Sequence, residues 1–130
     1  VLPTMPRVLF DASYEMLRRS PGTMKIVGRA EGLPFRAQSF FLISMIGVTE
    51  YIDQTEMLLK EISRVSQPDA WLLLTSAPRT MANLVRRVLG ARLFLRSDAE
   101  MASLLAVANF KMVGRRRTFM QSQWLLHKTN

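Results

Sequence analysis

The stretch at residues 8–17, VLFDASYEML, constrains the fold more than any other part of the chain. A short apolar run ends in Asp11, and Ser13 then occupies the position of a helix N-cap. This pattern predicts a strand at Val8–Asp11 and a helix at Tyr14–Ser20. Open α/β sheets bind their ligands outside the carboxyl ends of the strands, so Asp11 is predicted to face a ligand.

The same alternation of strands and helices continues to the end of the chain. Apolar runs and helical spacing of apolar residues mark the further elements. The expected strands are Met24–Gly28, Phe40–Ile46, Trp71–Ala77, Phe110–Thr118 and Gln121–Lys128, and the expected helices run from Asp53 to Ser66, from Met81 to Leu89 and from Ser97 to Ala108. This order predicts a Rossmann-like α/β fold with a mostly parallel sheet, helices on both faces and a C-terminal antiparallel hairpin.

Local signals predict where several of these helices begin and end. Asp53–Glu56 and Ser97–Glu100 both have the spacing of a capping box, with Asp53 and Ser97 in the cap position. Gly90 is expected to close the helix that runs from Met81 to Leu89. Asn109 is expected to take a left-handed conformation after the helix that ends at Ala108. In the first helix, Met16 and Leu17 are expected to face the sheet.

Composition excludes several classes of site. The 130 residues fit one domain, and the absence of cysteine rules out disulfides and thiolate chemistry and favours a cytoplasmic protein. His127 is the single histidine, so neither a zinc site nor a Ser–His–Asp triad is predicted, and no metal is expected. The longest apolar stretch, Phe40–Val48, is too short to span a membrane.

The net charge of +8 raises the question of a nucleic-acid partner. The arginines are scattered along the chain, and aromatic residues are not interleaved with them as base stacking would require. Neighbours in a strand alternate faces, so Arg115–Arg117 cannot all point at one phosphate. We therefore favour a solvated surface, with a charged edge strand at Arg115–Arg117, over a nucleic-acid footprint.

Four stretches together resemble a known family. These are Val8–Leu17, Gly28–Phe35 (GRAEGLPF), Ser39–Ile52 (SFFLISMIGVTEYI), and Leu58–Val65 with Pro68 and Trp71–Thr75. Their order and spacing over residues 8–77 resemble the class I S-adenosylmethionine-dependent methyltransferases, in the branch that acts on small molecules. Leu105–Leu126 is similar to the closing hairpin of the same family.

The resemblance implies roles for particular residues. Asp11 would bind both ribose hydroxyls of S-adenosylmethionine, and the backbone N–H of Ala30 would bind its adenine. The other residues that the resemblance places at the cofactor are Ala12, Arg29, Glu31 and Ser44. Glu50 and Tyr51 follow the fourth strand of the family, where its active site lies, so they are the catalytic candidates. A solvated Glu50 and a packed Tyr51 are the alternative.

The chain also departs from the family pattern. Arg29 replaces the usual acidic residue before Ala30, Phe41 replaces an aspartate, and Asp69–Ala70 replaces a Gly-Gly turn. No glycine-rich first strand precedes Asp11, which would leave a gap in the middle of the sheet. We therefore expect a single, N-terminally incomplete methyltransferase-like domain, completed by an upstream segment or a second copy. The alternative function is a degenerate, non-catalytic binding or scaffold protein, with RNA as one partner.

Overall fold

The computed structural model describes residues 7–19, 21, 24–118 and 120–129. The chain divides into two compact units, one ending at Pro34 and the other beginning at Phe35. Each unit is an α/β structure in its own right.

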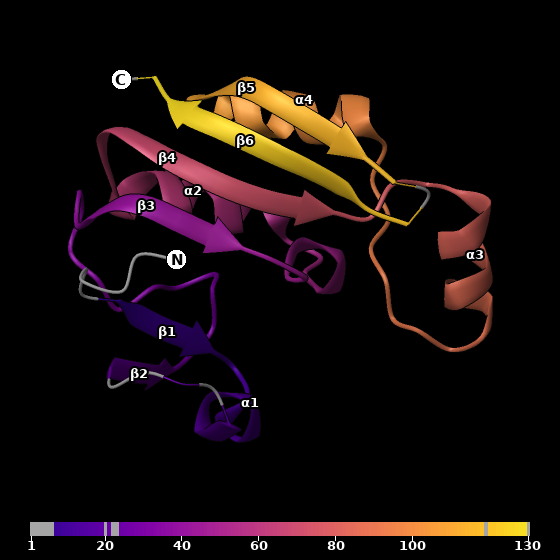
Figure 1. Ribbon diagram of the computed structural model, residues 1–130, viewed down its shortest axis with the longest axis horizontal. Helices are drawn as coiled ribbons and strands as arrows, with labels where there is room; N and C mark the ends of the chain where they lie inside the picture. Colours follow the sequence, from indigo (N-terminus) through magenta and orange to yellow (C-terminus); the bar gives the residue numbers. More distant parts are fainter. Residues whose placement is uncertain (1–6, 20, 22–23, 119, 130) are drawn as a thin grey trace. The chain divides into compact units, whose positions relative to one another are not determined.

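The first unit is a strand–helix–strand structure (Figure 1). Strand β1 (Val8–Asp11) pairs in parallel with β2 (Met24–Val27), and helix α1 (Tyr14–Arg19) connects them. These bounds confirm the predicted strands and helix, although the predicted helix end at Ser20 lies outside the described residues. Leu17 is buried as expected, but Met16 is 59% exposed, so the expectation that it faces the sheet is wrong. Only one side of this short helix, the side that carries Leu17, is buried.

The second unit contains a four-stranded mixed sheet in the order β3-β4-β6-β5. Strands β3 (Phe40–Met45) and β4 (Ser66–Ser76) are parallel, whereas β6 (Ser122–Lys128) is antiparallel to both β4 and β5 (Phe110–Arg117). The predicted C-terminal hairpin is thereby confirmed. Strand β4 begins at Ser66 rather than at Trp71, because the chain leaves the preceding helix in an extended conformation and Ser66 pairs with Phe40.

Helices α2 (Thr55–Val65) and α4 (Asp98–Val107) lie on the same side of this sheet (Figure 1). Their apolar sides are buried together with alternate residues of β4 and β6. The core members on the helices are Leu58, Leu59, Ile62, Val65, Met101 and Leu105, and those on the strands are Leu72, Leu74, Trp124 and Leu126. The other side of β4 carries Trp71 and Leu73, each 39% exposed.

The two predicted capping boxes differ in outcome. Ser97 caps α4, since its side chain accepts a hydrogen bond from the Glu100 N–H at 3.1 Å. Asp53 does not cap α2, because the N-cap is Gln54 and no side-chain cap hydrogen bond forms there. The Asp53 carbonyl instead accepts a hydrogen bond from the distant Arg96 at 2.6 Å, and the N-cap lies one residue later than predicted.

Helix α3 (Met81–Val88) follows β4, and a one-turn helix η1 (Thr49–Tyr51) follows β3. Gly90 and Asn109 have positive φ values of 103° and 67°, which confirms their predicted roles after α3 and α4. No helix among the described residues combines the length and the apolar character needed to cross a membrane.

Candidate cofactor and acceptor site

Asp11 lies at the carboxyl end of β1 and is exposed. Its Oδ1 accepts a hydrogen bond from the Ser13 N–H at 2.9 Å, while the Ser13 hydroxyl caps α1 by accepting from the Met16 N–H at 3.3 Å. This turn is a local consequence of the sequence Asp-Ala-Ser, because aspartate side chains bond the backbone two residues on. Among the described residues, no hydrogen bond to the second carboxylate oxygen is formed.

The glycine loop after β2 lies at the same end of the first unit. The Gly28 N–H donates to the Asp11 carbonyl at 3.0 Å, so the two segments are joined directly. A Cβ at Gly28 would lie 2.8 Å from the ring of Phe10, so any larger residue would require that ring to shift. The structure thus brings Asp11 and Ala12 together with the segment that holds Arg29, Ala30 and Glu31.

The residues of this loop differ in exposure. Arg29 points outward, with a side chain that is 83% exposed, and its Nε lies 3.6 Å from the Glu31 carboxylate. The loop turns tightly, since the Gly32 N–H donates to the Arg29 carbonyl at 3.1 Å. Ala30 is half-buried between them, and no described residue accepts a hydrogen bond from its N–H. A backbone donor of this kind is suited to a ring nitrogen of a planar ligand.

In the second unit, the start of the chain after β3 is bound to Thr75, near the end of β4. The Gly47 N–H donates to Thr75 Oγ1 at 2.8 Å, and the Thr49 hydroxyl donates to the Thr75 carbonyl at 2.7 Å. Gly47 has a φ of 67°, a left-handed conformation that glycine adopts without strain. Ser44 lies on β3 just before this turn and is exposed.

Glu50 is the residue of this loop with the most unusual surroundings. It is only 8% exposed, and its Oε2 is buried with no hydrogen-bond partner among the described residues. Its backbone carbonyl accepts from the Phe94 N–H at 2.7 Å, so the segment after α3 covers it. Tyr51, by contrast, is 56% exposed. The alternative of a solvated Glu50 and a packed Tyr51 is therefore wrong in both parts.

Arg96 joins the two segments that surround Glu50. Its guanidinium donates to the carbonyls of Phe94, Ile52 and Asp53 at 3.2, 3.3 and 2.6 Å. Burial lowers the pKa of this guanidinium, and the nearby Asp53 carboxylate partly opposes that effect. Next to it is an open surface cavity of about 390 Å³, lined by Asp53, Gln54, Thr55, Glu56, Met57, Arg96 and Leu104.

The predicted site residues thus form two groups. Asp11, Ala12 and the loop from Arg29 to Glu31 belong to the first unit, whereas Ser44, Glu50 and Tyr51 follow β3 in the second. Sequence analysis missed Thr75 and Arg96, which shape the second group. Thr75 had a weak signal, as a hydroxyl at the end of an apolar run. Arg96 had none, because its bonds go to backbone carbonyls more than 40 residues away.

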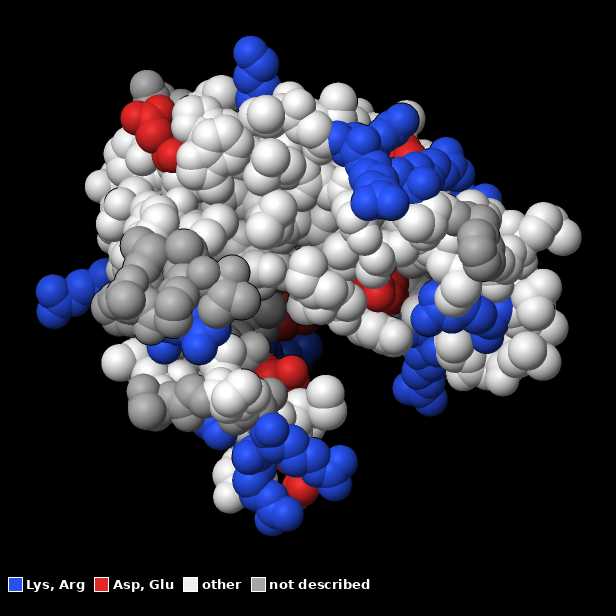
Figure 2. Space-filling model, viewed as in Figure 1, with Lys and Arg blue, Asp and Glu red and all other residues white. Residues whose placement is uncertain are grey.

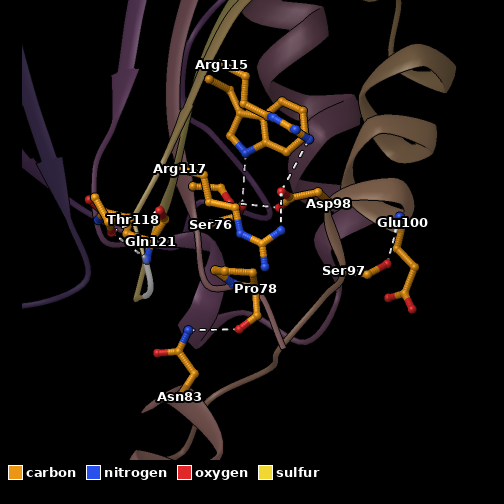
Figure 3. A network of polar contacts seen from close by, with 12 residues as sticks. Ser76, Pro78, Asn83, Ser97, Asp98, Glu100, Arg115, Arg117, Thr118 and Gln121 are labelled. Carbon is orange, nitrogen blue, oxygen red and sulfur yellow. Dashed lines mark hydrogen bonds and ion pairs between the residues drawn. The ribbon is translucent and has the colours of Figure 1, made fainter. Parts of the chain in front are cut away.

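The basic strand β5 belongs to a different network (Figure 3). The Asp98 Oδ1 accepts from the Ser122 hydroxyl at 2.8 Å, and its Oδ2 lies 3.3 Å from Arg115 and 3.5 Å from Arg117. The distances to Oδ2 are ion pairs without hydrogen-bond geometry. Alternate residues of β5 thus meet one internal carboxylate, as expected of a strand at the edge of the sheet.

No group of three or more His, Cys, Asp or Glu side chains within the described part of the chain is placed to hold a metal ion.

Comparison with protein families matches residues 7–74 to the model described as "Methyltransferase domain". That segment includes both groups of predicted site residues. The comparison with curated proteins found no match.

Solved structures of methyltransferases share the fold. One is an S-adenosylmethionine-dependent methyltransferase from Methanosarcina mazei, with a TM-score of 0.75 and 19% identity over 93% of this chain and 81% of that one. Another, from Thermotoga maritima, is described as a possible histamine N-methyltransferase and has a TM-score of 0.80 and 18% identity over 95% and 73%.

A third similar structure contains bound ligands. It is the 1,6-didemethyltoxoflavin-N1-methyltransferase of Burkholderia thailandensis, with bound 1,6-didemethyltoxoflavin and S-adenosylhomocysteine. Its TM-score is 0.72 and its identity 15%, over 95% of this chain and 61% of that one.

Proposed function

This chain belongs to the methyltransferase-domain family, and from that premise we propose that it transfers a methyl group from S-adenosylmethionine to a small-molecule or lipid-like acceptor. When bound, S-adenosylmethionine supplies a methyl group on a positively charged sulfur, which is a strong electrophile. The protein therefore has to bind and orient the two reactants, exclude water and accept a proton from the acceptor.

The observation that carries this proposal is the placement of Asp11. Its carboxylate is exposed at the carboxyl end of β1, beside the loop that begins at Gly28. A carboxylate accepts several hydrogen bonds at once, so it can keep its bond to Ser13 and still bind two vicinal hydroxyls. In this proposal Asp11 and Ala12 bind the ribose, and the segment from Arg29 to Glu31 binds the adenine through the Ala30 N–H.

Glu50 is proposed to take the proton or hydrogen bond of the acceptor. A buried carboxylate oxygen without a partner is costly to the folded protein, so its retention favours a functional role. Tyr51 is exposed next to it and is proposed to contact the acceptor, and the exposed Ser44 is proposed to contact the cofactor. Their roles rest on family resemblance and on this local geometry.

We also propose that the chain acts as one domain whose sheet is completed by an additional strand. Among the described residues, β3 has β4 as its single neighbour, and its residues Phe41 and Leu42 are 47% and 36% exposed. An exposed apolar edge strand is a ready template for another strand. An upstream segment or a second copy would supply it, and sedimentation velocity separates these two sources. The cysteine-free sequence supports a cytoplasmic location.

Calorimetry with S-adenosylhomocysteine on the full chain tests the cofactor role. We expect micromolar binding that weakens at least about tenfold in Asp11→Asn, because the lost charge weakens bonds to the ribose hydroxyls. The amide oxygen of asparagine can still accept from the Ser13 N–H, so the turn is preserved. Glu15→Gln, an exposed change on the neighbouring helix, serves as the control and should bind like the parent protein.

The same titration distinguishes the proposed function from the alternative function. A degenerate scaffold protein would bind no S-adenosylhomocysteine and would instead show salt-sensitive affinity for RNA. The outward-pointing Arg29 at the adenine position is the observation that favours this alternative. Equal affinity of the parent and Asp11→Asn would contradict the proposed role of Asp11.

A further inference from the structure

Helix α3 differs from α2 and α4 because its apolar side is exposed instead of buried. The exposed apolar residues are Met81 (76%), Leu84 (41%), Val85 (51%), Val88 (86%) and Leu89 (81%). They stand at positions i, i+3, i+4, i+7 and i+8, so they form one continuous stripe along the helix. We call these five residues the α3 stripe. Soluble proteins usually bury a stripe of this spacing.

The polar side of α3 holds the helix in this orientation. Asn83 is completely buried, and its Nδ2 donates to the carbonyls of Pro78 at 2.8 Å and Met120 at 3.0 Å (Figure 3 shows the first). Its Oδ1 accepts from Arg86 at 2.9 Å. Rotating the helix to bury the α3 stripe would break these bonds, so the exposure of the stripe is built into the fold.

The chain segment that contains the stripe is basic, and among the described residues its one arginine with an acidic partner is Arg79, which lies 3.2 Å from Glu100. Between Asp69 and Asp98 the chain contains five arginines and no acidic residue. Arg86 and Arg87 flank the stripe, and no acidic side chain in the described part of the chain pairs with Arg86, Arg87 or Arg92. On the face shown in Figure 2, α3 carries basic and uncharged side chains side by side.

We propose that the α3 stripe and its flanking arginines dock onto an anionic lipid surface. Helices that lie in a membrane interface combine an apolar side, which enters the lipid, with basic residues that attract its headgroups. Eight residues span only about 12 Å, so α3 is too short to cross a bilayer and is suited to lie on one. Charge complementarity selects this occupant over a second copy, which would bring equally basic helices together.

The position of this surface links it to the candidate acceptor site. The segment after α3 donates a hydrogen bond from Phe94 to the Glu50 carbonyl, and Arg96 binds the carbonyls of Ile52 and Asp53. The chain that follows α3 therefore connects this surface to the loop proposed to receive the acceptor. The lipid contact itself does not depend on the proposed function, since it requires neither cofactor nor acceptor.

Flotation of the full chain with lipid vesicles tests the proposal without any methyl-transfer assay. Vesicles of phosphatidylcholine mixed with phosphatidylglycerol should carry the protein upward, and vesicles of phosphatidylcholine alone should carry much less. The double change Val88→Ser and Leu89→Ser should lower the partition onto the anionic vesicles about tenfold. Both residues are more than 80% exposed, so the fold does not depend on them. Val107→Ser, on the exposed side of α4, is the matched control and should bind normally.

A second pair of variants tests the charge. Arg87→Gln should weaken vesicle binding several-fold more than Arg116→Gln, an exposed arginine on β5. Equal losses would mean that binding follows the overall net charge, and this would overturn the role of α3. No flotation with anionic vesicles would also overturn the proposal. So would a dimer in sedimentation velocity that dissociates in the Val88→Ser and Leu89→Ser variant without any lipid binding.

Discussion

Asp98 and Glu50 are both mostly buried carboxylates of the second unit, and each has one buried oxygen without a hydrogen-bond partner among the described residues, but Asp98 also has two arginines and a hydroxyl beside it. Asp98 faces the Ser122 hydroxyl and two arginines within 3.5 Å, whereas Glu50 Oε2 has no partner among the described residues. Burying a carboxylate costs free energy unless donors or cations compensate it. The comparison indicates that Asp98 stabilises the fold and that Glu50 is retained at a cost to stability, which is typical of functional residues.

Neutralising Asp98 should have the largest effect on stability. Asp98→Asn keeps the shape of the side chain but leaves Arg115 and Arg117 facing each other without a carboxylate. We expect the free energy of unfolding to fall by about 2 kcal/mol, a value reduced because both arginines are partly exposed. Urea denaturation followed by tryptophan fluorescence measures it, since Trp124 is buried in this unit. An unchanged unfolding midpoint would show that the network carries no net stabilisation.

Neutralising Glu50 should act in the opposite direction. Glu50→Gln removes the charge from a carboxylate that has one buried oxygen without a hydrogen-bond partner among the described residues, and we expect the free energy of unfolding to rise by about 1 kcal/mol. The same urea experiment measures it, with Asp98→Asn as the matched change of carboxylate to amide. A destabilised Glu50→Gln protein would mean that the carboxylate contributes to the fold, and the contrast with Asp98 would then disappear.

The loop that carries Glu50 should depend on Thr75. Thr75→Val preserves the shape of the side chain and removes the acceptor for the Gly47 N–H. The expected loss is about 1 kcal/mol, with faster amide hydrogen exchange at Gly47. Thr129→Val also removes one threonine hydrogen bond, but at an exposed position, and should cost only a few tenths of a kcal/mol. Equal losses in the two variants would argue against a specific anchor at Thr75.

The smallest expected difference is between neighbouring arginines of β5. Arg117→Gln removes one of the two cations that face Asp98 and should cost about 0.5 kcal/mol, whereas Arg116→Gln should be neutral within error. Thermal unfolding of the two variants side by side resolves this difference. A larger loss in Arg116→Gln would contradict the alternation of faces along β5 that places Arg115 and Arg117 together.

Local sequence signals predicted the elements where neighbouring residues decide the outcome. The capping box at Ser97–Glu100 and the left-handed Asn109 depend on a few consecutive residues and were predicted correctly. The capping box at Asp53 failed although its pattern was equally good. There the Asp53 carbonyl binds Arg96, which lies 43 residues further along the chain, and no local pattern contains that partner.

Periodicity of apolar residues identified the helices but did not decide which side each one buries. The spacing on α2 and α4 predicts burial and the core confirms it, whereas the same spacing on α3 is exposed. The reason is a pair of hydrogen bonds from Asn83, one of them to the distant Met120 carbonyl. A buried amide that finds its partners can therefore determine the orientation of a short helix against its apolar periodicity.

The sequence by itself determined the order of strands and helices, the family to which the chain belongs and the position of Asp11 at the end of a strand. These follow from short-range patterns, because caps, turns and alternating burial are set by residues close together in the chain. Only the tertiary structure decided that Glu50 Oε2 is buried without a hydrogen-bond partner among the described residues, that Asp98 is paired with arginines and that the apolar side of α3 is exposed. Those outcomes depend on contacts between residues far apart in the sequence, whose free energies no local pattern records.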